Sequence, residues 1–221
     1  MLLRQRRVII RGCDLRQLFI GFASAIAVAA GLSSTPVAAE SPVDPAVNAI
    51  KSFYAALVDV MKRGKELGLE GRFRQLKSAT ESAFDLTEMT RLSVGPSWTG
   101  MPEGDRKALV NAVERLTLVN YAKNFSKFSG EQFIVQPDAK PRSDDKIVES
   151  KLVASDGTQV AFNYRMHPVD GHWKIVDIYL NGNISQLALR RADFASTVQK
   201  VGPTGLVEKL NQMVDKQMTP D

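Results

Sequence analysis

The residues best suited to acid–base or metal chemistry in this sequence are two histidines and one aspartate. His167 and His172 flank a predicted turn, where their imidazoles could approach each other, but no further zinc ligand stands beside them. Asp177 lies within an apolar strand, where burial would raise the pKa of a carboxyl and suit it to act as a general base. The alternative is that Asp177 is solvated at a sheet edge or paired with Lys174 or Arg165.

Motifs of the common enzyme classes do not stand out in the chain. No Ser, His and Asp follow the order of a hydrolase triad with a nucleophile elbow, and no glycine-rich phosphate loop follows a strand. We interpret the histidines as partly exposed residues at strand ends. The sequence therefore predicts no catalytic residue, no metal site, no cofactor and no enzymatic activity.

The elements that must position these residues begin with helices. Apolar residues recur with helical period from Ile50 to Met61 and predict a helix over about 45–65. A second helix is expected to turn Phe73, Leu76 and Ala79 inward. A third is expected to start at a capping box of Asp85 and Glu88, and a long helix with two apolar stripes, and hence two neighbours, over about 102–128.

The period changes to two in the second half of the chain. Strands are predicted near 132–136, 146–154, 158–167 and 172–180, and the polar segment 138–145 is predicted to be a mobile loop. The strands should be apolar on both faces and need cover on both sides. In the last strand, Trp173 and Ile175 are predicted to point one way, and Val176, Ile178 and Leu180 the other.

Two helices are predicted to follow the strands. The first should carry Ile184, Leu187, Phe194 and Val198 inward, and the second Leu206, Leu210, Met213 and Val214. The predicted fold class is α+β: N-terminal helices, a curved antiparallel sheet of about four strands, and C-terminal helices packed across it, enclosing an apolar cavity.

Residues 1–39 are predicted to be a cleaved secretory signal peptide, and residues 40–221 a single domain. Five arginines precede the apolar run 18–32, and Val37-Ala38-Ala39 offers small side chains to a peptidase. A retained membrane anchor and a twin-arginine route through Arg6-Arg7 are the alternatives.

Cleavage would change the charge of the protein. It removes five arginines and Asp14, so Lys+Arg falls from 29 to 24 and Asp+Glu from 24 to 23. The near-neutral remainder gives no reason to expect a nucleic-acid partner. It also lacks the one cysteine, Cys13, and an exported chain without cysteine suits a bacterial periplasm.

Some clusters favour a binding partner over catalysis. Lys62-Arg63-Gly64-Lys65 and Arg190-Arg191 could meet anionic head groups, or they could be solvated helix faces. The aromatic side chains could line an apolar cavity or fill an ordinary core.

Several short motifs, in this order and spacing, resemble the MlaC family of periplasmic phospholipid-binding proteins, also called toluene-tolerance auxiliary proteins. The resemblance covers residues 50–210. The motifs are Phe84-Asp85-Leu86 with Met89 and Leu92, Gly95 with Trp98, Tyr121-Ala122 leading to Ser129-Gly130, Tyr164-Arg165-Met166, and Gly171-His172-Trp173-Lys174-Ile175-Val176-Asp177 with Gly182 and Phe194-Ala195. Gly182-Asn183-Ile184-Ser185 and the segment 61–72 are similar to the hopanoid-associated branch, HpnM.

The resemblance implies a carrier that shuttles a phospholipid or a hopanoid between an inner-membrane transporter and an outer-membrane partner, and we expect it to act as a monomer. On this hypothesis the lipid contacts Phe53, Tyr54, Leu57, Met61, Phe84, Met89, Leu92, Trp98, Tyr121, Phe125, Phe162, Tyr164 and Ile178. Two alternatives remain at this point: a pocket enzyme that uses Asp177 as general base, and an envelope assembly module that binds only proteins.

Overall fold

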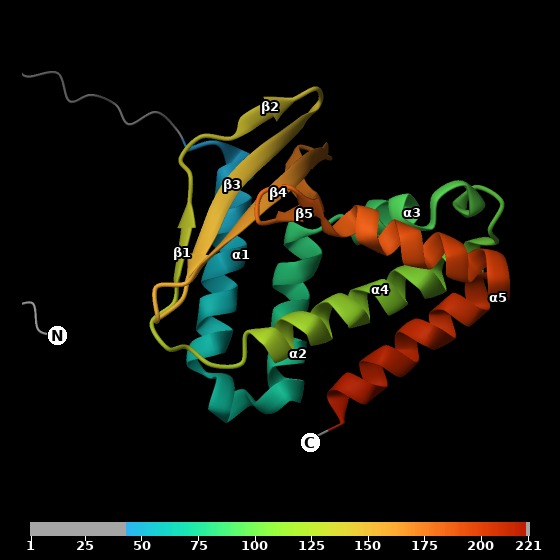
Figure 1. The fold of residues 1–221 in the computed structure, drawn as a ribbon, viewed down its shortest axis with the longest axis horizontal. Coiled ribbons are helices and arrows are strands. Elements are labelled where there is room, and N and C mark those ends of the chain that lie inside the picture. The colour runs from blue at the N-terminus through green and yellow to red at the C-terminus, as the bar shows by residue number, and fades with distance from the viewer. Residues whose placement is uncertain (1–42, 220–221) are drawn as a thin grey trace, which may run out of the picture. The chain divides into compact units, whose positions relative to one another are not determined.

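The computed structural model describes residues 43–219, so the predicted signal peptide lies outside the described residues. Helices come first, strands follow and a long helix ends the described chain (Figure 1), as the α+β prediction requires. The helices are α1 (Pro45–Lys62), α2 (Gly64–Ala83), α3 (Leu86–Val94), the short 3₁₀ helix η1 (Gly95–Trp98), α4 (Glu103–Asn124) and α5 (Gln186–Met218). The strands are β1 (Gln132–Val135), β2 (Lys140–Arg142), β3 (Asp145–Val153), β4 (Gln159–Val169), β5 (His172–Leu180) and β6 (Ile184–Ser185).

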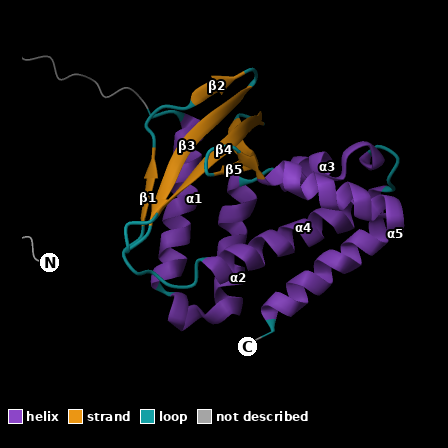
Figure 2. Cartoon of the chain, viewed as in Figure 1, coloured by secondary structure: helices purple, strands orange, loops and turns teal. Residues whose placement is uncertain are grey.

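The strands form one six-stranded antiparallel sheet in the order β1-β3-β4-β5-β6, with β2 beside β3 (Figure 2). The sequence predicted about four strands and missed β2 and β6, which have three and two residues. The prediction of a loop over 138–145 is therefore wrong, because Lys140–Arg142 pairs with Asp145–Ile147. This pairing uses backbone groups, so an exposed edge strand can form from polar residues and even contain Pro141.

An extra residue, Val176, interrupts the pairing of β4 with β5. Arg165 pairs with Asp177 and Met166 pairs with Ile175, so Val176 has no partner in β4. This two-against-one arrangement is a β-bulge, and it shifts the alternation of side chains along β5.

The bulge places Trp173, Ile175, Ile178 and Leu180 of β5 on one face of the sheet, which we call the inner face, while Val176 lines a polar hollow beside Arg165 and His167. Directly paired residues share a face, and the inner-face pairs are Phe162 with Leu180, Tyr164 with Ile178, Met166 with Ile175, and Pro168 with Trp173. The other face, the outer face, carries polar pairs such as Asn163 with Tyr179 and Arg165 with Asp177. The prediction that Trp173 and Ile175 point one way and Ile178 and Leu180 the other is therefore wrong.

Two hydrophobic clusters hold the helices in place. The first contains the buried face of α1, including Phe53 and Leu57, packed on the inner face of the sheet at Val148 and Met166. The second joins α4 and α5 through residues such as Leu109. Because α4 contributes to both clusters and packs on α2 as well as α5, its two apolar stripes serve two neighbours, as predicted.

The two predicted C-terminal helices form one element, α5, with a sharp kink. Gly202 has φ 74°, a left-handed conformation that favours glycine, and Pro203 follows it. Figure 1 shows α5 running away from the sheet and then turning back along α4. Phe194 and Val198 are buried as expected, whereas Ile184 and Met213, predicted to face inward, are 45% and 42% exposed.

The capping box predicted at the start of α3 forms only in part. Asp85 Oδ1 accepts from the backbone N–H of Glu88 at 2.8 Å, as predicted. Glu88 does not reach back, because its carboxylate pairs with Arg91. The Asp85 N–H instead donates to the carbonyl of Ile175 at 3.0 Å, which ties α3 to β5.

The junction of α1 and α2 is held against the end of α4 by Arg72. Its guanidinium donates to the carbonyl oxygens of Gly64 at 2.7 Å and Ala122 at 2.8 Å. Gly64 is buried at this junction, and a Cβ at this position would overlap the carbonyl oxygen of Ser126.

We therefore expect Gly64→Ala to lower the free energy of unfolding by about 1–3 kcal/mol, because the backbone of Ser126 must shift. Gly104→Ala in α4 is the matched control, since nothing lies within 4 Å of a Cβ there. The control should leave stability unchanged or raise it by up to about 1 kcal/mol. Urea unfolding followed by circular dichroism measures both changes, and equal stability of the two variants would contradict the packing described for Gly64.

Candidate functional site

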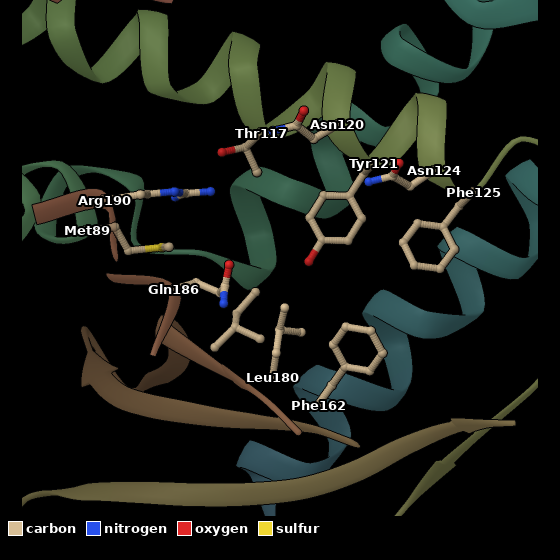
Figure 3. A pocket seen from close by; sticks show the side chains of 11 residues that line it. Met89, Thr117, Asn120, Tyr121, Asn124, Phe125, Phe162, Leu180, Gln186 and Arg190 are labelled. Atoms are coloured by element: carbon tan, nitrogen blue, oxygen red, sulfur yellow. The ribbon is translucent and has the colours of Figure 1, made fainter. Parts of the chain in front are cut away.

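A cavity of about 190 Å³ lies between α4, the inner face of the sheet, α3 and the start of α5. Figure 3 shows side chains from these elements converging on it. Its lining residues are Met89, Thr117, Asn120, Tyr121, Asn124, Phe125, Phe162, Ile178, Leu180, Gln186 and Arg190. The local sequence pattern explains these positions: strand alternation turns Phe162 and Leu180 inward, and helical spacing puts Thr117, Tyr121 and Asn124 on one side of α4.

One part of the cavity wall is apolar. Phe125, directly after α4, and Phe162, on β4, approach it, and Leu180 lies on β5 (Figure 3). Ile178 extends the wall along β5. Phe125 stacks on Tyr121, with ring centroids 5.8 Å apart and planes inclined by 20°. Such a surface offers no reactive group and suits hydrocarbon.

The other part of the wall is polar. Arg190 reaches into the cavity from α5, and Thr117 approaches from α4 (Figure 3). The Thr117 side chain is buried, and its Oγ1 has no hydrogen-bond partner among residues 43–219. Burial lowers the pKa of Arg190 and raises that of Tyr121 well above its usual range, so the guanidinium stays charged and the phenol stays protonated at neutral pH.

Beside the cavity, three hydroxyl-bearing residues link α1 to the sheet. The Tyr54 hydroxyl lies 2.7 Å from Ser150 Oγ and 2.9 Å from the Tyr164 hydroxyl. Ser150 Oγ also donates to the Phe162 carbonyl at 2.6 Å. These groups satisfy one another inside the first cluster and leave Tyr54 and Tyr164 as core residues.

Residues 51–212 match the profile of the MlaC protein family. The chain belongs to the MlaC family. This match nearly coincides with the 50–210 range over which the sequence motifs resembled the family. A comparison with curated proteins finds no match.

A solved structure from Ralstonia solanacearum has the same fold. It is described as a phospholipid-binding protein in complex with a phospholipid, and it superposes with a TM-score of 0.70. The two sequences are 19% identical, and the match covers 80% of this chain and 100% of the other. Within residues 43–219, no helix of this MlaC-family chain is long and apolar enough to span a membrane.

The structure distributes the residues predicted to contact lipid among four places. Those in the cavity wall are Met89, Tyr121, Phe125, Phe162 and Ile178. Those packed in the first cluster are Phe53, Tyr54, Leu57, Met61, Phe84 and Tyr164. Trp98 packs against the second cluster beside Arg106, and Leu92 borders a polar hollow near Arg142 and Asp145.

Sequence reasoning missed most of the polar residues of the cavity. Arg190 was grouped with Arg191 as one basic cluster, but Arg191 is exposed and Arg190 faces the cavity. The spacing along the helix could have separated the two arginines. Arg190 lies three residues after Leu187 and four before Phe194, which places it within the inward stripe. Thr117, Asn120 and Asn124 carried no comparable signal.

The residues that suggested chemistry have other partners. His167 Nδ1 lies 2.6 Å from Asp145 Oδ1, and His172 is exposed. No group of three possible metal ligands occurs within residues 43–219.

Asp177 is buried and holds the start of α5. Ser185 Oγ donates to its Oδ2 at 2.6 Å, and the backbone N–H groups of Ile178 and Leu187 donate to its Oδ1 at 2.7 and 2.9 Å. The general-base interpretation required Asp177 to face inward beside Tyr54 or Tyr164. Asp177 belongs to the outer-face pairing instead, so that interpretation is wrong.

We expect Asp177→Ala to lower the free energy of unfolding by about 2–4 kcal/mol, because the Ser185 hydroxyl and the Leu187 backbone N–H at the start of α5 lose their acceptor. Asp193→Ala is the control. It removes an acid from the same helix region whose ion pair with Lys209 is exposed, so its effect should stay below about 1 kcal/mol. Thermal and urea unfolding test the pair, and an Asp177→Ala protein as stable as the control would contradict the anchoring role.

Proposed function

We propose that this MlaC-family protein is a periplasmic carrier that holds a membrane lipid in the cavity and moves it, as a monomer, between an inner-membrane transporter and the outer membrane. The observation that carries the proposal is the cavity wall of Phe125, Phe162, Ile178 and Leu180 beneath α4. Family membership supports it. The phospholipid held by the Ralstonia protein makes phospholipid the first ligand to test.

A hopanoid is the second ligand to test. The segment 182–185, whose sequence is similar to the hopanoid-associated branch, forms the turn and β6 directly before Gln186 in the cavity wall. A change of length in this segment would move Gln186, which it precedes, relative to the cavity. A fused-ring lipid is rigid and asks for a wider cavity than flexible acyl chains do.

The need for such a carrier follows from the cost of exposing hydrocarbon to water. Each methylene kept from water is worth about 0.8 kcal/mol, so a chain of about fifteen carbons has about 12 kcal/mol opposing its escape into the aqueous phase. A carrier lowers this barrier with apolar surface and needs no reactive side chain. The cavity offers such a surface.

The cavity must widen to accept a whole lipid. Its volume of about 190 Å³ is below the roughly 300–1,000 Å³ of ordinary small-molecule sites. We propose that α4 and α5 move away from the inner face of the sheet when lipid enters. The unbranched side chains of Met89, Gln186 and Arg190 in the wall can widen the cavity further by changing rotamer.

Protein isolated from the periplasm of its producing cells should carry lipid. Organic-solvent extraction followed by mass spectrometry identifies the ligand, and the proposal expects a phospholipid or a hopanoid in near-stoichiometric amount. Lipid-free protein should also gain lipid from vesicles of phosphatidylethanolamine and phosphatidylglycerol. A preparation that carries no lipid and gains none from these vesicles would overturn the proposed function.

A charge in the apolar wall should block loading. Leu180→Glu places a carboxylate where hydrocarbon must lie, and we expect lipid uptake from vesicles to fall about tenfold or more. Leu189→Glu is the control, because Leu189 is 58% exposed and lies outside the cavity wall. Uptake is measured by mass spectrometry of the re-isolated protein, and equal uptake by both variants would place the lipid elsewhere.

A further inference from the structure

Polar groups without partners gather at one end of the cavity, which we call the inner end. It comprises Thr117, Arg190 and the hydroxyl of Tyr121, beside the buried Met89 (Figure 3). Neither the Arg190 guanidinium nor the Tyr121 hydroxyl forms a hydrogen bond or ion pair with any side chain or backbone group in the described range 43–219. The Thr117 hydroxyl has no partner there either.

The nearest candidate acid is already engaged. Asp177 contributes to the electrostatic environment of Arg190 but forms no ion pair with it within residues 43–219. Its two oxygens accept from Ser185 Oγ and from the N–H groups of Ile178 and Leu187. Arg190 therefore keeps its donors free for another anion.

Arg190 is partly buried in the cavity wall, where a guanidinium without a partner loses hydration at a cost, and nothing in the packing of α5 demands one. Position 190 lies in the inward stripe between Leu187 and Phe194, where an aliphatic side chain would fill the same space. The guanidinium carries its charge at neutral pH and presents a planar fork of N–H donors. That fork matches two oxygens of a carboxylate or a phosphate.

We propose that Arg190 and Thr117 form an oxyanion subsite, which binds the carboxylate or phosphate of an anionic amphiphile whose hydrocarbon lies against Phe125 and Phe162. The Tyr121 hydroxyl stands at the same end and adds a further donor. The subsite rests on the proposed function and refines it: the cavity selects lipids by an anionic group held inside the protein, where water competes least for it.

The test compares two fluorescent ligands of the same length. Parinaric acid carries a carboxylate, and its methyl ester has the same chain without the charge. Wild-type protein should bind the acid about tenfold or more tightly than the ester, as expected for a hydrogen-bonded charge pair. Arg190→Gln and the isosteric Thr117→Val should weaken binding of the acid and leave binding of the ester nearly unchanged.

Arg191→Gln is the matched control. It removes the same charge from the next residue of α5, which is exposed, so long-range electrostatics change equally while the cavity does not. This variant should bind both probes as the wild type does. Arg190→Lys keeps the charge without the fork and should bind the acid with intermediate affinity.

The outcomes separate the subsite from the carrier function. Equal affinity of the wild type for acid and ester, or equal losses in Arg190→Gln and Arg191→Gln, would overturn the subsite while lipid binding stands. Failure of the wild type to bind either probe, or lipid from vesicles, would overturn the proposed function as well. Displacement of parinaric acid by inorganic phosphate alone would overturn the assignment to an amphiphile.

Stability supplies an independent readout. Arg190→Met replaces the partly buried charge by an apolar side chain of similar length, so the melting temperature of lipid-free protein should rise by a few degrees while affinity for the acid falls. Arg191→Met should shift the melting temperature much less. A fall in melting temperature for Arg190→Met, beyond that of Arg191→Met, would show that Arg190 serves packing and would overturn the proposal.

Discussion

The whole arrangement of cavity and helices depends on one extra residue in β5. Val176 has no partner in β4, and this bulge brings Ile175 and Ile178 to the same face of the sheet. Without it, strict alternation would put them on opposite faces and divide the apolar inner face in two. The same shift turns Asp177 to the other face, where it meets the first turn of α5. One extra residue therefore keeps the cavity wall at Ile178 and the core contacts at Ile175 on the same face of the sheet, and leaves Asp177 on the other face to anchor α5.

The sequence predicted the regular parts of the fold well because their signals are local. Helical spacing located α1, alternation located β5 at 172–180, and Asp85 was identified as the cap of α3. The bulge escaped because two adjacent apolar residues, Ile175 and Val176, look the same whether a strand is apolar on both faces or has gained a residue. Strand β2 escaped because its pairing with the start of β3 uses backbone groups, which leave no alternation in its three exposed side chains.

The cavity was harder to predict than the fold. Aromatic residues were expected to line it, but Phe53 and Tyr54 of α1 are packed in the first cluster. Protein interiors are close-packed, and periodicity alone does not show which part of an apolar surface is left without a neighbour. Arg190 and Arg191 look alike in sequence, and only the phase of α5 separates them. A polar residue within an apolar helix stripe says little about the fold. It is a useful indication of a functional site, because a polar group that loses water without gaining a partner lowers stability.

The hydroxyl cluster of Tyr54, Ser150 and Tyr164 has a consequence for how uniquely this chain folds. A slip of β3 along β4 by one residue would turn Val148 away from α1, and the hydroxyl cluster adds a directional penalty to that loss of apolar contact. A slip of one residue would carry Ser150 to the opposite face and strand two phenols in a dry interior. These hydroxyls therefore specify the register of β3 against β4. They add little net stability to the native pairing, but they raise the free energy of the neighbouring registers.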